Sequence, residues 1–289
     1  MADGILKQSV GKLRAMRPAQ IRREALRPFH LELIGAEEAD QARLGRVFVP
    51  GHLRGPERAR ALEHLDAHPD AHPDRRPARP RLRVRTPAAL DLEATSAVAP
   101  AVVVDPLDPE PGLLALLTAH PTHRLALARV FPVLRPPLAR EMIRAVAARN
   151  AAIAAVSALP EVIPNPLGVL LAIGEMGSDT VLITANQIEL AFRLAALRGD
   201  DVGWRAQSRA LAAVIGAGLG WRTLARELVG WIPAGIGVAA KASVAYTGTM
   251  AVGEALWRLP HRREGRIWRA VEELSPATRR RLARRRQTA

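Results

Sequence analysis

The sequence contains no cysteine, only three lysines and few aromatic residues, which make up 3% of its 289 residues. Without cysteine the chain cannot form a disulfide scaffold, a thiolate zinc site, an iron–sulfur cluster or a cysteine nucleophile. Hydrophobic residues nevertheless make up 48% of the chain and the mean hydropathy is +0.00. This composition excludes a wholly disordered chain, and the length suffices for one large domain or two modest ones.

The basic charge is carried almost entirely by arginine and is concentrated near the C-terminal end. Lysine and arginine total 42 against 28 acidic residues, a formal net charge of +14. The segment from Arg258 to Ala289 alone holds eleven arginines and three glutamates, a net charge of +8. One interpretation is an arginine-rich solvated surface, and the other is attraction to lipid headgroups or nucleic acid. The uneven distribution favours the second.

The first part of the chain is predicted to form a basic helix and then a small α/β domain. Apolar residues at helical spacing over residues 1–27 predict a basic amphipathic helix that ends at Pro18. Strands that alternate with helices predict the α/β domain over residues 28–134. The expected strands are 29–34 (an edge strand), 46–49, 81–85 and 101–104, the expected helices are 56–68 and 112–119, and residues 68–80 form a proline-rich loop.

The remainder is predicted to be an all-α, Gly/Ala-rich domain over residues 135–262, followed by a basic C-terminal helix and tail over residues 263–289. Pro137 suits the first position of a helix that ends before Pro160. Ser178 is predicted to cap a helix over residues 179–198, which Gly199 ends. Further helices are expected at residues 202–218, 222–231, 236–259 and 263–274.

The loop after the first expected strand lacks the residues that hold a nucleotide. A phosphate-binding loop reads G-x-x-x-x-G-K-[ST]. Gly35 supplies the first glycine, but Asp40, Gln41 and Ala42 stand where glycine, lysine and a hydroxyl residue belong. The strand that ends at Asp105 resembles one that supplies a magnesium-binding aspartate, yet no Asn-Lys-x-Asp motif is present. We therefore expect a degenerate, GTPase-core-like domain with no bound cofactor and no enzymatic activity.

A short histidine repeat leaves metal binding as an open alternative. His64, His68 and His72 are spaced by four residues, and two histidines one helical turn apart can chelate zinc. However, Pro69 breaks a helix before the third histidine. A slipped repeat in a polar loop is the other interpretation, and it is the one that we favour.

Apolar segments of the helical part are individually too short to span a membrane, but their ends resemble a membrane interface. Residues 228–253 form the longest weakly charged segment, which only Lys241 interrupts. Gly216 and Gly220, one turn apart, predict close helix packing. Four of the five tryptophans directly precede arginine, as in an interfacial belt. A soluble helical bundle is the alternative. The five tryptophans are Trp204, Trp221, Trp231, Trp257 and Trp268.

Several short motifs of the helical part are shared with a known family. They are Arg140–Arg144 running into Asn150-Ala151, Ala158-Leu-Pro160, Pro164-Asn-Pro166, Thr184-Ala-Asn-Gln187-Ile188, Leu194–Leu197 before Gly199, and the glycine-rich residues 228–237. Through them, residues 135–257 resemble the YcjF-like, GTPase-associated domain of unknown function found in bacteria. The resemblance implies helical hairpins that are often predicted to enter membranes, a GTPase as fused domain or partner, and no catalytic residues.

The sequence thus predicts a non-enzymatic accessory or scaffold protein at the cytoplasmic face of a membrane, peripheral or inserted as a helical hairpin. Its expected partners are an anionic membrane surface and a bacterial GTPase, and self-association stays open. The alternative is a soluble helical protein that binds nucleic acid or a protein through its arginine-rich tail. Nucleic acid is disfavoured because the tryptophans do not interleave with the last basic cluster. That cluster is Arg279, Arg280, Arg281, Arg284, Arg285 and Arg286.

Overall fold

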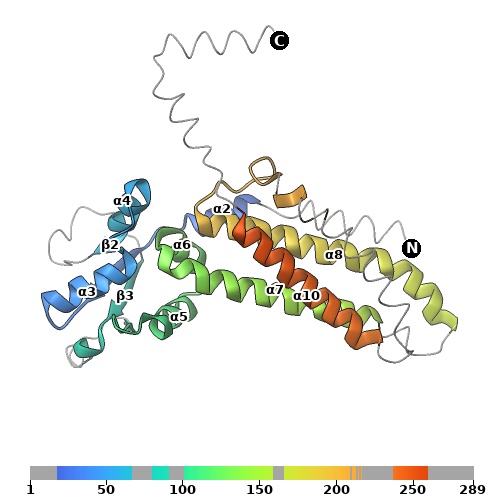
Figure 1. Cartoon of the computed structure of the whole chain (residues 1–289), viewed down its shortest axis with the longest axis horizontal. Coiled ribbons are helices and arrows are strands. Elements are labelled where there is room, and N and C mark those ends of the chain that lie inside the picture. Colours follow the sequence, from blue (N-terminus) through green and yellow to red (C-terminus); the bar gives the residue numbers. More distant parts are fainter. Residues whose placement is uncertain are drawn as a thin grey trace, which may run out of the picture. The chain divides into compact units, whose positions relative to one another are not determined.

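The structure of the chain is a computed structural model. It describes residues 18–66, 80–90, 101–158, 166–208, 210–212, 214, 216 and 237–259. By its internal contacts the chain divides into two compact units, Met1–Arg258 and Leu259–Ala289. The first unit combines a small parallel sheet with many helices, which confirms the expected α+β class (Figure 1).

Four parallel strands form the sheet, in the order β2-β1-β3-β4. The strands are β1 (His30–Ile34), β2 (Leu65–Asp66), β3 (Arg81–Arg85) and β4 (Val102–Val103). Three of them confirm predicted strands. The two-residue β2 was not predicted, because so short a segment shows no periodicity.

Strand β1 is an internal strand and not the edge strand that its sequence predicts. It pairs with β2 on one side and with β3 on the other. Its polar residue Glu32 suggests a solvated face, yet Glu32 is only 8% exposed. Arg83, directly opposite on β3, donates a hydrogen bond from Nε to Glu32 Oε2 at 3.1 Å. This cross-strand ion pair allows the charged face of β1 to be buried.

The helices around the sheet are α3 (Glu38–Phe48), α4 (Gly55–Glu63) and α5 (Pro109–Ala119), with a single 3-10 turn, η1 (Pro87–Ala89). The strand predicted at residues 46–49 is wrong, because residues up to Phe48 belong to α3. Leu44 and Phe48 lie one turn apart and are both fully buried, so they form the apolar stripe of a helix. Helix α4 ends at Glu63 and not at residue 68, since the chain then enters β2.

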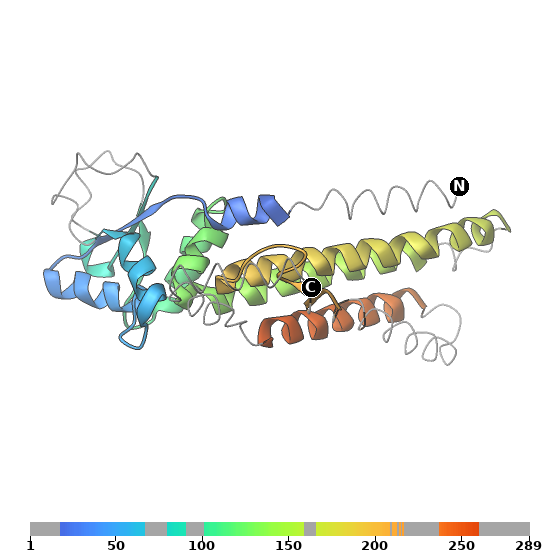
Figure 2. The same ribbon diagram turned by 90° about the horizontal axis from the view of Figure 1, so that it is seen from above.

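Long helices make up the rest of the first unit, and three of them contact one another pairwise: α7 (Arg135–Ala158), α8 (Pro166–Arg198) and α10 (Gly237–Arg258). Two views show them running side by side (Figures 1 and 2). The shorter elements are α2 (Pro18–Ala25), α6 (Arg124–Val130) and the 3-10 turn η3 (Pro132–Leu134). Helices α2 and α6 both contact α8 and also each other.

The bounds of α7 and α10 confirm the predicted helices, but the helix start predicted after Ser178 is wrong. Pro18 is the first residue of α2, a position that its fixed φ allows, and the helix predicted to end at Pro18 lies outside the described residues. Ser178 lies inside α8, because that helix already begins at Pro166. The predicted end at Gly199 is confirmed: its φ is +87°, and the next amide, of Asp200, donates to Ala195 O at 3.0 Å.

Two arginines close the C-terminal ends of long helices. Arg129 Nη1 donates to Ala196 O at 3.0 Å, in the last turn of α8. Arg198 Nη1 donates to Leu256 O at 2.6 Å, in the last turn of α10. The last carbonyls of a helix have no intrahelical partner and carry the negative end of its dipole. Part of the arginine content therefore stabilises helix ends and is not only a solvated surface.

A third arginine joins the helical bundle to the layer of the sheet. Arg135 is 8% exposed, and its guanidinium donates to Ala128 O and Arg129 O, both at 3.1 Å. It also forms an ion pair with Glu57 of α4 at 3.0 Å. The guanidinium of Arg135 thus binds both the end of α6 and a side chain of α4. Because Arg135 is the first residue of α7, these contacts fix the position of the start of α7.

Some predicted elements lie outside the described residues: the helix before residue 18, the loop after residue 66, and the helices at 222–231 and 263–274. Residues 208, 210–212, 214 and 216 are helical, within the helix predicted over 202–218, but the predicted start is wrong because residues 203–207 form a bend and turns. Within the part of the chain that the structure describes, no helix combines the length and the apolar character that a membrane crossing requires. A transmembrane helix is therefore not found there.

Candidate functional site

The carboxyl ends of β1 and β3 are the first place to look for a ligand site. In open parallel sheets, ligands bind where the connections of two neighbouring strands diverge. Strand β1 connects to β2 on one side, whereas β3 lies on the other side, so the divergence falls between β1 and β3. Gly35 and Thr86 follow these strands directly, and Thr86 N donates to Ile34 O at 3.0 Å.

The chain itself fills the space at Gly35. A Cβ atom added there would lie 2.5 Å from Gln41 N and 2.9 Å from Glu37 O. Gln41, in the position of a phosphate-binding lysine, donates instead from Nε2 to Leu33 O at 2.8 Å. The first turn of α3 also carries acidic side chains, which oppose an anion at a helix N-terminus. This geometry argues against a phosphate cradle at Gly35.

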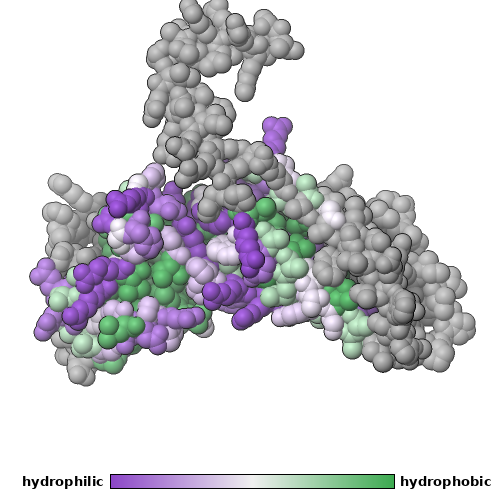
Figure 3. All heavy atoms as spheres, viewed as in Figure 1, coloured by the Kyte–Doolittle hydropathy of each residue, from purple (hydrophilic) through white to green (hydrophobic). Residues whose placement is uncertain are grey.

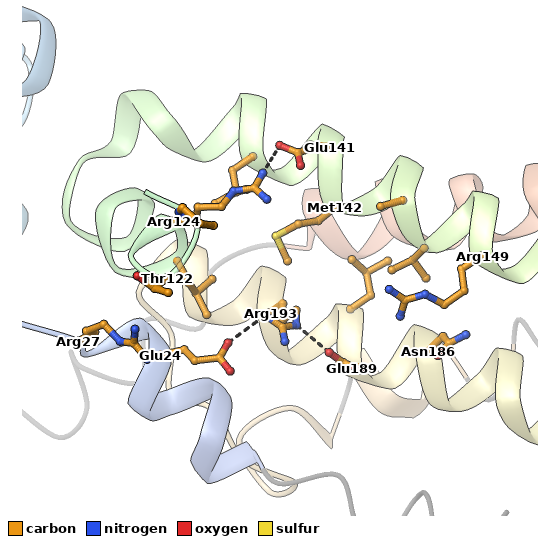
Figure 4. A pocket seen from close by; sticks show the side chains of 16 residues that line it. Glu24, Arg27, Thr122, Arg124, Glu141, Met142, Arg149, Asn186, Glu189 and Arg193 are labelled. Carbon is orange, nitrogen blue, oxygen red and sulfur yellow. Dashed lines mark hydrogen bonds and ion pairs between the residues drawn. The ribbon is translucent and has the colours of Figure 1, made fainter. Parts of the chain in front are cut away.

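A cavity of about 450 Å³ lies between α2, α6, α7 and α8 (Figure 4). This volume is within the range of small-molecule sites. One part of the lining is apolar, and the other part carries four arginines and three glutamates. The apolar part includes Leu125, Leu138, Met142, Val146 and Leu190. The charged part comprises Arg27, Arg124, Arg149 and Arg193 with Glu24, Glu141 and Glu189.

Every carboxylate of the cavity is paired with an arginine of the cavity. Arg193 contacts Glu189 at 2.8 Å and Glu24 at 3.1 Å, and Arg124 pairs with Glu141. Glu189 and Arg193 lie four residues apart on α8, a spacing at which opposite charges pair across one helical turn. The contact with Glu24 links α8 to α2 across 169 residues of sequence, so local spacing could not predict it.

A second polar group of interest is buried between the three long helices, and we call it the amide cluster. Asn150 Nδ2 donates to Thr249 Oγ1 at 3.0 Å, and Asn186 Nδ2 donates to Asn150 Oδ1 at 2.7 Å. Gln187 Nε2 approaches the same Thr249 hydroxyl at 3.3 Å. The cluster joins α7, α8 and α10, and Asn186 also lines the cavity. In the sequence, these residues could be noticed only as single polar residues among the apolar residues of predicted helices.

Two histidines next to the cavity have lowered pKa values. Burial lowers the pKa of His120 below its ordinary value. Burial also lowers the pKa of His123, and the positive charge of Arg27 and the neighbouring His120 lower it further. His123 Nδ1 lies 3.1 Å from the Thr122 hydroxyl. Both imidazoles are therefore neutral near pH 7, beside a positively charged end of the cavity.

Of the predicted membrane-contact residues, two tryptophans lie in the described part of the chain. Trp204 is 44% exposed, and its ring meets Phe192 edge-on at 5.1 Å. Trp257 is half-buried near the end of α10. Lipid contact at these residues stays a prediction. The tryptophans at 221, 231 and 268 and the six arginines at 279–286 lie outside the described residues.

The close helix contact that the structure shows is made at Gly253, a glycine other than the predicted Gly216 and Gly220. A Cβ at Gly216 would meet no atom of the described residues within 4 Å, and Gly220 lies outside them, so their packing stays a prediction. At Gly253 of α10, by contrast, a Cβ would lie 2.6 Å from Ile143 Cγ2 of α7. A small residue there allows the two helices to approach closely.

The histidine repeat is described only at its first member. His64 Nδ1 lies 2.9 Å from Arg60 O, at the end of α4. His68 and His72 lie outside the described residues, so metal binding by the repeat stays open. Elsewhere in the described ranges, no three histidine or acidic side chains gather as a metal site would require.

Comparison with known proteins assigns the chain to no family. No family model matches it, and no curated protein or solved structure matches it either. Function is therefore inferred from the residues and contacts described above.

Proposed function

We propose that this protein is a non-enzymatic accessory or scaffold protein that lies on the cytoplasmic face of a membrane and binds anionic lipid headgroups. The observation that carries the proposal is an uncharged, exposed face of α10 that leads directly into the arginine-rich segment. Ser243, Tyr246, Thr247 and Ala251 are exposed on this helix, within the uncharged residues 242–253. The helix surface is accordingly pale in Figure 3, which colours charged residues purple.

The two neighbouring features provide the two signals that stable attachment to a membrane surface requires. A helix face of small and aromatic residues can lie in the interface plane without crossing the bilayer. Each arginine near an anionic surface contributes about 1 kcal/mol at most, so a segment of net charge +8 supplies strong attraction. Trp204 and Val156, which are 44% and 66% exposed, add apolar surface to the helical part.

The sheet supports the second part of the proposal, a GTPase as protein partner. We take residues 28–134 to be a degenerate, GTPase-core-like domain, because the sheet is parallel and its loop at Gly35 is filled. The resemblance of residues 135–257 to the YcjF-like domain favours an intact GTPase as the binding partner. Saturable micromolar binding of GTP by the full chain would contradict the degenerate assignment.

Flotation of the full chain with lipid vesicles tests the membrane proposal. We expect flotation with phosphatidylcholine vesicles that contain phosphatidylglycerol, and little flotation with phosphatidylcholine alone. Addition of the anionic vesicles should shift tryptophan emission to the blue, because tryptophan moves toward the headgroups. A variant with glutamine at the six arginines of residues 279–286 should lose most of the flotation at low salt.

A variant of equal net charge provides the matched control. It replaces six exposed arginines outside the long helices by glutamine, so only the position of the lost charge differs. Equal flotation of both variants would contradict attachment through the C-terminal segment. Nuclease-sensitive sedimentation in place of flotation would support the nucleic-acid alternative. The control arginines are Arg22, Arg23, Arg43, Arg46, Arg54 and Arg58.

A further inference from the structure

Two arginines at the cavity between α2, α6, α7 and α8 remain without a carboxylate. The three glutamates of the lining are bound by Arg193 and Arg124. Within the part of the chain that the structure describes, neither Arg27 nor Arg149 forms an ion pair. The charged lining has a net charge of +1: the two unpaired arginines carry +2, the pair of Arg124 with Glu141 is neutral, and Arg193 with its two glutamates carries −1. The guanidinium donors of the two unpaired arginines are available to a ligand.

The two arginines lie at opposite ends of the cavity. Figure 4 shows Arg27, just beyond α2, on one side and Arg149 of α7 on the other, with Arg193 between them. Arg149 extends into the space between α7 and α8 (Figure 4). Of the apolar lining, Met142 and Val146 are half-buried and so offer apolar surface to an occupant, whereas Leu138 and Leu190 are buried. An occupant thus meets positive charge at the ends and an apolar wall along its length.

We propose that this cavity binds a small organic anion, namely a phosphate or carboxylate group carried on an apolar body of a few carbon atoms. The planar guanidinium groups match the geometry of both anions and bind them with two parallel hydrogen bonds. The apolar wall selects an anion with a hydrocarbon part over inorganic phosphate, because its burial adds to the binding free energy. Asn186 adds a polar side chain to this lining, and its hydrogen bond to Asn150 of the amide cluster holds it in place.

Calorimetric titration of the full chain tests the proposal with four monomeric probes: hexyl phosphate, hexanoate, inorganic phosphate and hexanol. We expect saturable binding of hexyl phosphate or hexanoate, at least about tenfold tighter than inorganic phosphate, and no saturation by hexanol. The stronger of the first two probes identifies the anionic group. Failure of both to bind saturably, or binding no tighter than that of inorganic phosphate, would overturn the proposal.

Variants on the same helix separate the cavity from general attraction. Because Arg27 and Arg149 lie at opposite ends of the cavity, the anionic group of the probe can meet only one of them. Either Arg149→Gln or Arg27→Gln should therefore weaken binding of the better probe by about tenfold, and that variant identifies the end that the anion occupies. Arg144→Gln is the matched control: Arg144 is an exposed arginine of α7 that does not line the cavity. If neither Arg149→Gln nor Arg27→Gln lost more affinity than Arg144→Gln, the assignment to this site would be overturned.

A variant that fills the cavity leaves all its charges in place. Ala145 is exposed and lines the cavity, so Ala145→Trp should abolish binding while the protein keeps its fold and its arginines. The variant with glutamine at the arginines of residues 279–286 should bind the probe with unchanged affinity. This pair of results distinguishes the cavity from the proposed membrane attachment, which depends on the C-terminal segment. Unchanged binding by Ala145→Trp, at wild-type thermal stability, would contradict the site.

Discussion

The layer of the sheet and the bundle of long helices bury polar side chains in different ways. In the sheet, the charged pair of Glu32 and Arg83 is buried between neighbouring strands, with side chains that are 11% and 14% exposed. In the bundle, the buried group is the neutral amide cluster around Asn150 and Thr249, which are 0% and 1% exposed. Buried charge in the helical part, such as Arg135 and Arg198, lies instead at helix ends, where main-chain carbonyls accept from the guanidinium.

The difference follows from what sets the alignment of each layer. Parallel strands align through their backbone hydrogen bonds, so Glu32 meets Arg83 because the register places them opposite each other. Helices share no backbone hydrogen bonds, and apolar contacts alone specify the position of one helix along another only weakly. A buried polar contact that is satisfied in only one register can fix it. We therefore expect the amide cluster to matter more for the register of α7 and α10 than the ion pair matters for the strands.

The largest effect is expected for Gly112→Ala, at the contact between α5 and β4. A Cβ there would lie 2.6 Å from Val103 O and 2.7 Å from Val104 Cα, which are backbone atoms that cannot rotate away. We expect the free energy of unfolding to fall by about 3 kcal/mol. Chemical denaturation followed by circular dichroism and by tryptophan emission measures it. Because residues 1–258 form one compact unit, the denaturation midpoints measured by circular dichroism and by tryptophan emission should fall by the same amount.

The same substitution in the helical bundle provides the comparison. Gly253→Ala should cost about 2 kcal/mol, since the close atoms belong to the side chain of Ile143, which can shift slightly. At Gly216 a Cβ would meet no atom of the described residues within 4 Å, so Gly216→Ala should stabilise by up to about 1 kcal/mol through helix propensity. A loss of stability there would instead support the close packing predicted from the sequence. If Gly112→Ala shifted only the circular dichroism signal, the two layers would unfold independently.

A smaller loss is expected for Arg135→Lys, at the junction of the two layers. Lysine keeps the charge, but its single ammonium nitrogen cannot reach all three acceptors that the planar guanidinium of Arg135 binds. These acceptors are Ala128 O, Arg129 O and Glu57 Oε1. We expect a loss of about 2 kcal/mol in the free energy of unfolding. Arg140→Lys, at an exposed position of the same helix, should change it by less than about 0.5 kcal/mol. Equal melting temperatures for the two variants would show that the guanidinium contacts do not join the layers.

Asn150→Leu tests the role of the amide cluster. The substitution removes the acceptor of Asn186 and the donor to Thr249 while roughly keeping the side-chain volume. We expect a loss of about 1 to 2 kcal/mol, because the buried Thr249 loses a partner whereas Asn186 can be hydrated. If the cluster fixes the helix register, hydrogen exchange should also rise along α10. Faster exchange in the sheet alone would contradict that role.

The sequence predicted those elements whose signal lies within one short segment. The strand at residues 81–85 and the end of α8 at Gly199 are confirmed, because alternation and a left-handed glycine are local features. Residues 46–49 were misassigned, since their β-branched and aromatic residues were judged without Leu44, one turn before Phe48. Ser178 suggested a cap, although the helix continues through it from Pro166.

The candidate cavity was less accessible to sequence reasoning, because its contacts join distant segments. Glu189 and Arg193 could be paired from their spacing, but Glu24 is 169 residues away from Arg193. Likewise Asn150 and Thr249 are separated by 99 residues. No periodicity links such residues, and the packing of the helices alone brings them together. The unpaired arginines could be recognised only after the partners of the other two were known.

The smallest effect is expected from pH, and it concerns the two histidines beside the cavity. Burial lowers the pKa of His120 and of His123, and Arg27 lowers that of His123 further. Below the ordinary value of 6.5, the unfolded chain therefore binds protons that the folded protein does not. The free energy of unfolding should fall as the pH falls through this range, and these groups should add no slope above about pH 7.

Denaturation midpoints between about pH 5.5 and 7.5 measure this slope around the ordinary pKa of histidine. The double variant His120→Gln, His123→Gln should show a flatter dependence, because the groups that differ in proton binding are gone. Arg27→Gln should flatten it partly, since it removes one of the causes that lower the pKa of His123. His52→Gln, at an exposed position, is the control and should keep the wild-type slope. A double variant as steep as the wild type would show that other groups cause the acid sensitivity.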